Sequence, residues 1–165
     1  GMLVFYASIL KLLNIKNFKV LGIDIKIRNV NKKRIINSGF YKNIDLYEKS
    51  STDSSLFKSF EKKYFFKKNK KLIILDSNHT KDHVLNELNF YSEILNKGDY
   101  IIVMDTVIEF INQKFNKNKN FKRGNSPFSA VKIFLKQNKN FVVDKYYENK
   151  SFLTGARNGF LKKIK

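Results

Sequence analysis

The amino-acid sequence predicts an α/β fold, in which a mostly parallel, doubly wound sheet lies between two layers of helices in a single domain over residues 1–165. Short apolar runs alternate with segments of helical periodicity along the chain, and this alternation is typical of parallel strands joined by helical crossovers. Three apolar runs end in an acid, at Asp24, Asp76 and Asp105. A hydrophobic content of 42% in 165 residues suffices for one buried core.

Helix and strand patterns alternate through the first 65 residues. Apolar spacing predicts a helix where residues repeat every three to four positions, and a buried strand where a short apolar run stops at an acid. Gly39 is a favoured residue after a helix C-terminus, and Asp53 is a suitable N-cap. The expected elements are a helix over 3–13, a strand over 18–24, a helix over 32–38, a strand over 44–47 and a helix over 54–65.

The second part of the chain repeats the alternation more clearly. Ser126 followed by Pro127 predicts a helix start, because serine caps helices and proline suits the first helical position. The polar segment 110–123 is expected to be a mobile loop or lid. The expected elements are a strand over 71–76, a helix with apolar residues from 84 to 95 that ends at 97–98, a strand over 100–105, a helix over 126–135, and strands over 141–145 and 159–164.

The charge of the chain is strongly positive, with 33 Lys and Arg against 14 Asp and Glu and a net charge of +19. Because lysine is spread through every segment and arginine is scarce, an ordinary lysine-rich surface is favoured over a specific nucleic-acid site. Peripheral association with anionic surfaces and self-association stay open. The absence of cysteine fits a reducing cytoplasm, and no apolar run reaches the roughly 20 residues of a membrane span.

The acids that end the strands are the first candidates for chemistry, since ligands of open α/β sheets bind at the carboxyl ends of the strands. Asp24 is placed to accept hydrogen bonds from the hydroxyls of a ribose. Asp76 and Asp105 end consecutive strands that we expect to be neighbours, and two converging carboxylates suit Mg²⁺. Roles as helix caps or turn formers remain the alternative for each.

Two histidines follow Asp76 in the same turn and helix. His79 could act as a general base, because the pKa of imidazole lies near neutrality, or it could cap the helix or contact a ligand. His83 lies four residues further on and is expected to be structural. A zinc site would need a third protein ligand beside them.

These residues resemble the cephalosporin hydroxylase and rhamnosyl O-methyltransferase family. The similarity is most specific in the Asp-Ser-Asn-His-Thr stretch at 76–80, and it covers essentially the whole chain. The other similar segments are 81–88, 98–106, 20–25, 50–53, 124–135 and 155–162.

The resemblance implies a Rossmann-like, class I methyltransferase fold that binds S-adenosylmethionine and a divalent metal ion. Asp24 would hold the adenosyl ribose and Ser51 would lie near the adenine. Asp76 would contact the cofactor site and the metal ion, with Asp105 as a second metal ligand. Gly1 would be the last residue of a glycine-rich turn before the first helix.

The sequence departs from the family pattern at three places. Met104 stands where an acid usually precedes Asp105, and Lys26 replaces a second acid after Asp24. The chain also starts in the first expected helix, so the first strand and its glycine-rich turn are expected to be absent.

The function that follows is metal-assisted transfer of a methyl group from S-adenosylmethionine to a sugar hydroxyl of a glycolipid or surface polysaccharide. His79 and Asp76 are the expected catalytic residues. Two alternatives stay open: a non-catalytic domain that binds a partner chain, and a basic nucleic-acid-binding module.

Overall fold

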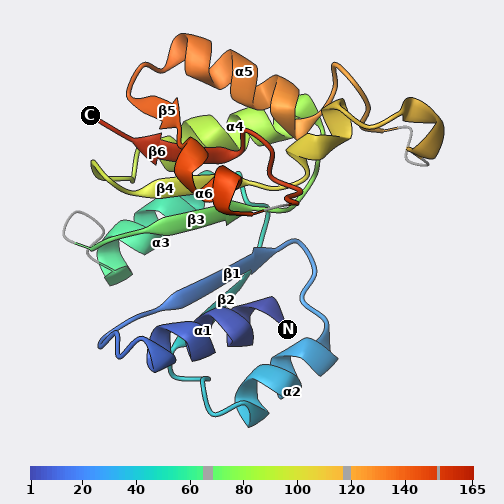
Figure 1. Ribbon diagram of the computed structural model, residues 1–165. Coiled ribbons are helices and arrows are strands. Elements are labelled where there is room, and N and C mark those ends of the chain that lie inside the picture. The colour runs from blue at the N-terminus through green and yellow to red at the C-terminus, as the bar shows by residue number, and fades with distance from the viewer. Residues whose placement is uncertain (65–68, 117–119, 152) are drawn as a thin grey trace. The chain divides into compact units, whose positions relative to one another are not determined.

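The computed structural model describes residues 1–64, 69–116, 120–151 and 153–165. Strands and helices alternate along the chain (Figure 1), which confirms the α/β class. The chain forms two compact units, Gly1–Asp53 and Ser54–Lys165. Each unit has its own sheet, and the two are described in turn.

The first unit is a two-stranded parallel sheet with two helices. Strands β1 and β2 pair from Val20 opposite Ile44 to Asp24 opposite Glu48, so both strands end level. The core combines Ala7 of the first helix with Val20 and Ile44 of the sheet. The elements are α1 (Met2–Leu12), β1 (Val20–Asp24), α2 (Asn29–Asn37) and β2 (Ile44–Glu48).

Close packing of α1 on this sheet depends on Gly22 in the middle of β1. A Cβ atom at this position would overlap the Leu3 side chain of α1 and lie 3.1 Å from Leu46 of β2. The absence of a side chain therefore lets α1 approach the strand directly.

The second unit contains a four-stranded sheet in the order β3-β4-β6-β5. Strands β3 and β4 are parallel, whereas β6 runs antiparallel to both β4 and β5. The elements are α3 (Ser54–Tyr64), β3 (Leu72–Leu75), α4 (Lys81–Ser92), β4 (Tyr100–Val103), the 3-10 helices η2 (Thr106–Glu109) and η3 (Gln113–Phe115), α5 (Pro127–Gln137), β5 (Phe141–Val143), α6 (Lys145–Lys150) and β6 (Phe160–Lys163).

Helices cover both faces of this sheet, with α4 behind it and the short α6 in front of it in Figure 1. Helices α4 and α5 pack against each other, and Leu88 and Phe134 are fully buried in them. Ile101 and Leu161, paired across β4 and β6, are equally buried. These apolar contacts form the core of the second unit, as the doubly wound arrangement predicts.

A buried ion pair fixes the starts of β3 and β4. The Lys71 ammonium lies 3.2 Å from the Asp99 carboxylate, and both side chains are buried. Asp99 also accepts hydrogen bonds from the backbone N–H groups of Lys71 and Asn96. Since a buried charge is costly unless it is paired, this network sets where the two strands begin.

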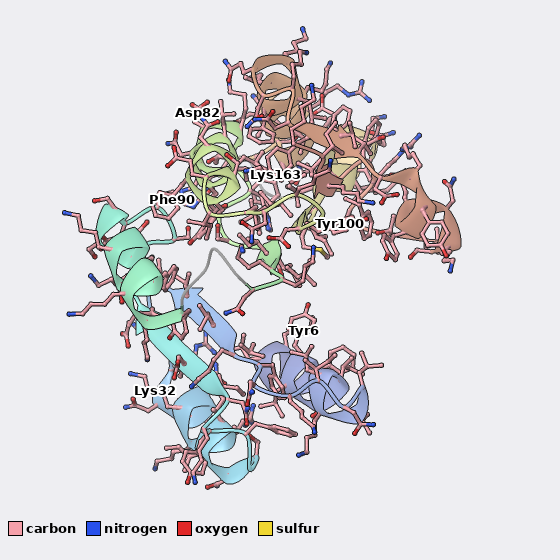
Figure 2. The ribbon with its side chains drawn as sticks, turned by 90° about the vertical axis from the view of Figure 1, so that its left-hand side faces the viewer. Tyr6, Lys32, Asp82, Phe90, Tyr100 and Lys163 are labelled. Atoms are coloured by element: carbon pink, nitrogen blue, oxygen red, sulfur yellow. The ribbon has the colours of Figure 1, made fainter. Side chains whose placement is uncertain are left out.

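Two elements differ from the sequence prediction. Helix α4 ends at Ser92, before Leu95 and Lys97, because Lys163 of β6 donates from Nζ to the carbonyl oxygens of Ser92 and Leu95 (Lys163 is labelled in Figure 2). Residue 145 begins helix α6, where a strand was predicted to end.

Helix α6 has a local cause, since the Asp144 side chain accepts a hydrogen bond from the backbone N–H of Tyr146 and so caps the helix. The remaining predicted elements are present within one to three residues at each end. Residue 65, the expected end of α3, lies outside the described residues. No helix in the described ranges combines the length and apolar character that crossing a membrane requires.

We expect Gly159→Ala to destabilise the second unit. A Cβ atom at Gly159 would overlap the backbone carbonyl oxygen of Val103 in β4, which cannot move without breaking the sheet. The overlap should cost about 1–3 kcal/mol of unfolding free energy, measured by thermal or urea denaturation. Gly155→Ala is the matched control, because its Cβ would meet only the Asp105 carboxylate at 3.5 Å. Equal stability of the two variants would contradict this packing.

Candidate functional site

The carboxyl ends of β3 and β4 form a polar edge in the second unit. Leu75 pairs with Val103 at the last position of the ladder, and the N–H of Met104 donates to the Leu75 carbonyl oxygen at 3.0 Å. The strands therefore end level, with Asp76 following one and Asp105 following the other. The prediction that these two strands are neighbours in the sheet is confirmed.

Three side chains converge at this edge. The Nε2 atom of His79 lies 3.4 Å from the Asp76 Oδ1 atom and 3.4 Å from the Asp105 Oδ2 atom. One ligand atom from each of the three residues lies within 4.8 Å of the others. The carboxylates are open to solvent, with 62% of Asp76 and 42% of Asp105 exposed, whereas only 19% of the His79 side chain is exposed.

Asp105 is presented in an unusual backbone conformation. Its φ of 54° and ψ of 21° lie in the left-handed region, which costs most residues about 1–2 kcal/mol and is tolerated best by glycine, asparagine and aspartate. The buried Thr106 hydroxyl donates to the Arg157 carbonyl oxygen at 2.6 Å, and the N–H of Val107 donates to Gly155. These bonds hold the turn so that the carboxylate faces His79.

His79 is also held from the other side. Its imidazole makes an edge contact with the Phe121 ring at 5.2 Å between centroids. The start of α4, just after His79, is anchored by Asn125, whose side-chain oxygen accepts a hydrogen bond from the N–H of Lys81. Thr80 occupies the N-cap position of α4 without a capping hydrogen bond from its side chain, and the His79 side chain points to the carboxylates.

Glu109 fastens the loop beside the site to the start of α5. Its carboxylate accepts hydrogen bonds from Ser126 Oγ at 2.6 Å, Ser129 Oγ at 3.1 Å and the N–H of Gly124 at 3.0 Å. Partial burial raises the pKa of the Glu109 carboxyl, but the bonds from Ser126, Gly124 and Ser129 outweigh burial and hold the pKa below its ordinary value. The described part of the expected polar loop at 110–123 thus contains η3, and contacts of Glu109 with Gly124, Ser126 and Ser129 hold together the segments on either side of it.

The other predicted site residues lie in the first unit. Asp24 is the last residue of β1, is exposed, and accepts a hydrogen bond from the N–H of Lys26 at 3.0 Å. Ser51 lies half-buried in the turn between β2 and α3. Gly1 is the N-cap of α1, and its carbonyl oxygen accepts a hydrogen bond from the N–H of Phe5.

Sequence reasoning missed two residues near the site. Glu87 is buried in α4 and accepts a hydrogen bond from Ser77 Oγ at 2.7 Å, and Glu109 anchors the loop. A glutamate on the apolar face of a predicted helix is the signal that could have identified Glu87. His83, expected to be structural, lies 3.5 Å from the Glu87 carboxylate and outside the cluster of Asp76, His79 and Asp105.

The fold and the polar edge define an α/β protein with two carboxylates and an imidazole gathered at the ends of two parallel strands. The model of the family described as rhamnosyl O-methyltransferase/CmcI matches residues 1–164. The chain therefore belongs to this family, and the resemblance drawn from 76–80 and 98–106 is confirmed.

Two mycobacterial relatives agree with this membership. Rhamnosyl O-methyltransferases of Mycobacterium tuberculosis and Mycobacterium bovis are each 29% identical to the chain over 164 residues, which is 98% of the chain. The chain spans 62% of the length of these relatives. Among solved structures, the MycE methyltransferase from the mycinamycin biosynthetic pathway, in complex with Mg and SAH, aligns with 89% of this chain and 38% of its own, at 12% identity and a TM-score of 0.49.

We expect Glu109→Gln to destabilise the second unit in a pH-dependent manner. Because the folded-state pKa of Glu109 is lowered, its charge stabilises the fold above the ordinary glutamate pKa of about 4.3, and this contribution is lost as the pH falls through the folded pKa. At pH 7 the loss should be about 1–2 kcal/mol.

Thermal denaturation between pH 3 and pH 7 measures the effect. The difference between Glu109→Gln and the unsubstituted chain should shrink toward the acid end of the range. Glu93→Gln, at an exposed position after α4, is the control and should change the melting temperature little. A difference that is constant with pH would show that the Glu109 charge does not stabilise this loop.

Proposed function

We propose that the chain is an S-adenosylmethionine-dependent O-methyltransferase that uses a divalent cation and acts on a sugar hydroxyl of a glycolipid or surface polysaccharide. The observation that carries the proposal is the convergence of Asp76, His79 and Asp105 at one edge of the sheet, in a chain of this family. The sugar acceptor is supported by the name of the mycobacterial relatives.

The residues at the edge fit a divalent cation. Carboxylate oxygens are the ligands that Mg²⁺ prefers, and a cation held by one or two carboxylates keeps several positions for water or substrate. The exposed carboxylates of Asp76 and Asp105 leave such positions open. A bound cation would orient neighbouring acceptor hydroxyls and lower the pKa of the one that reacts.

His79 is proposed as the group that takes the proton from the acceptor hydroxyl. Its Nε2 atom lies 3.4 Å from an oxygen atom of each carboxylate. Low exposure of the His79 ring and its contact with Phe121 restrict the ring to this orientation. A base within hydrogen-bond reach of a hydroxyl contributes about 10²–10⁴ in rate.

S-adenosylmethionine would supply an electrophilic methyl group on its sulfonium sulfur. For the first unit, we propose that Asp24 accepts hydrogen bonds from ribose hydroxyls, since its exposed carboxylate stands at the end of β1. Ser51 and Gly1 are proposed as further cofactor contacts in this unit.

We expect Asp76→Asn and Asp105→Asn each to weaken cation binding at least about tenfold, because each substitution removes one of two anionic ligands. Titration with Mn²⁺, followed by electron paramagnetic resonance of the free ion, measures the affinity without requiring turnover. Asp82→Asn is the matched control, since the Asp82 side chain is 83% exposed on α4 and lies outside the cluster. Equal affinities in all three variants would refute the cation site.

The same titration separates two roles for His79. If His79 is the proton acceptor, the His79→Gln variant should keep its Mn²⁺ affinity within about twofold and lose about 10²–10⁴ in the rate of methyl transfer. A loss of Mn²⁺ affinity as large as that of Asp105→Asn would instead make His79 a third ligand.

We expect Asp24→Ala to weaken binding of S-adenosylmethionine at least about tenfold, because charged hydrogen bonds to the ribose contribute about 1.5–3 kcal/mol. Isothermal titration calorimetry measures the affinity, and the melting temperature should stay unchanged because Asp24 is exposed. Asp45→Asn, on β2 in the same unit, is the control. Unchanged affinity in Asp24→Ala would remove the ribose assignment, and no saturable heat with the unsubstituted chain would remove the cofactor assignment.

A further inference from the structure

A buried carboxylate lies directly behind the turn that carries Asp76 and His79. Glu87 of α4 is 1% exposed, although a carboxylate is costly to remove from water. Its Oε1 atom accepts a hydrogen bond from Ser77 Oγ at 2.7 Å. Ser77 is the residue after Asp76, so this bond ties the first residues of the turn to the body of the helix.

The ion-pair contact of Glu87 is long and involves its Oε1 atom. His83 Nε2 lies 3.5 Å from Oε1, beyond a short hydrogen bond. Burial raises the pKa of the Tyr91 phenol, and the nearby charge of Glu87 raises it further. The Oε2 atom of Glu87 has no hydrogen-bond partner among the described residues. Such a group is retained at a cost in stability, which points to a role in function.

We propose that Glu87 is a positioning residue for the cation site, a role that rests on the proposed function. By accepting a hydrogen bond from the Ser77 hydroxyl, Glu87 holds the turn 76–80 against α4. Asp76 and His79 are then kept within reach of Asp105 on the neighbouring strand. Because Glu87 does not touch the cluster of Asp76, His79 and Asp105, it acts through Ser77.

Other contacts hold different parts of the turn. Thr80 N–H donates to the Asn78 side chain, and Lys81 N–H donates to Asn125, so both fix the end of the turn next to α4. Within the described part of the chain, the bond to Glu87 is the side-chain contact that fixes the start of the turn at Ser77. Outer partners of this kind are worth about 10–100-fold in metal affinity.

The test compares Glu87→Leu, Glu87→Gln and Ser77→Ala with Asp82→Asn as the matched control on the same helix. Two measurements are made on the purified chain: Mn²⁺ affinity by electron paramagnetic resonance, and amide hydrogen exchange of Thr80 and Lys81 without metal. Glu87→Leu and Ser77→Ala should each weaken Mn²⁺ binding about tenfold and speed up the exchange of both amides. Glu87→Gln keeps an oxygen acceptor for Ser77 and should restore most of both properties.

The combined Glu87→Leu and Ser77→Ala variant should be no worse than either single variant, because both remove the same bond. Wild-type affinity and exchange in Ser77→Ala, an exposed residue whose variant should fold even if Glu87→Leu does not, would overturn the proposal. A Glu87→Gln variant as impaired as Glu87→Leu would also overturn it, since the charge and not the hydrogen bond would then matter. If the unsubstituted chain binds no Mn²⁺, the cation site itself fails, and the exchange rates alone decide whether Glu87 positions the turn.

Discussion

The parallel pairing of β3 with β4 is the constraint on which the candidate site depends. At the start of the strands, Asp99 is buried and paired with Lys71. At their ends, the Met104 N–H donates to the Leu75 carbonyl oxygen. A shift of one residue in this register would turn the side chains after one strand to the opposite face. The level ends of the two strands therefore bring the acids that follow them to one edge.

Polar groups behind that edge hold Asp76 and Asp105 in a fixed geometry. The buried Thr106 hydroxyl stabilises the left-handed turn at Asp105 through the Arg157 carbonyl oxygen. Glu109 anchors the neighbouring loop through Ser126 and Ser129, and Glu87 accepts the Ser77 hydroxyl. Each of these hydrogen bonds fixes a turn or loop beside the acids, and so supports the geometry of the site.

Apolar periodicity and strand-ending acids were enough to predict most elements and the meeting of Asp76 with Asp105, because neighbouring parallel strands place their carboxyl ends together. The position of His79 between the two carboxylates could not be predicted, since it depends on a turn. Helix α6 follows from a local cap at Asp144 that the apolar pattern alone does not reveal, whereas the antiparallel direction of β6 depends on tertiary pairing, which local patterns do not encode. The Glu109 and Glu87 bonds link residues 10 to 20 positions apart and leave no periodic signal.

The most direct test of the account is paramagnetic broadening of backbone amide signals by substoichiometric Mn²⁺, observed by nuclear magnetic resonance. If Asp76 and Asp105 hold a divalent cation, the amides of 76–80 and 105–106 broaden first, and excess Mg²⁺ restores their intensity. Signals on the far side of the sheet, such as Lys71 and Asp99 at the starts of β3 and β4, stay sharp. Broadening that begins elsewhere, or that is uniform along the chain, would contradict the assignment of this edge as the cation site.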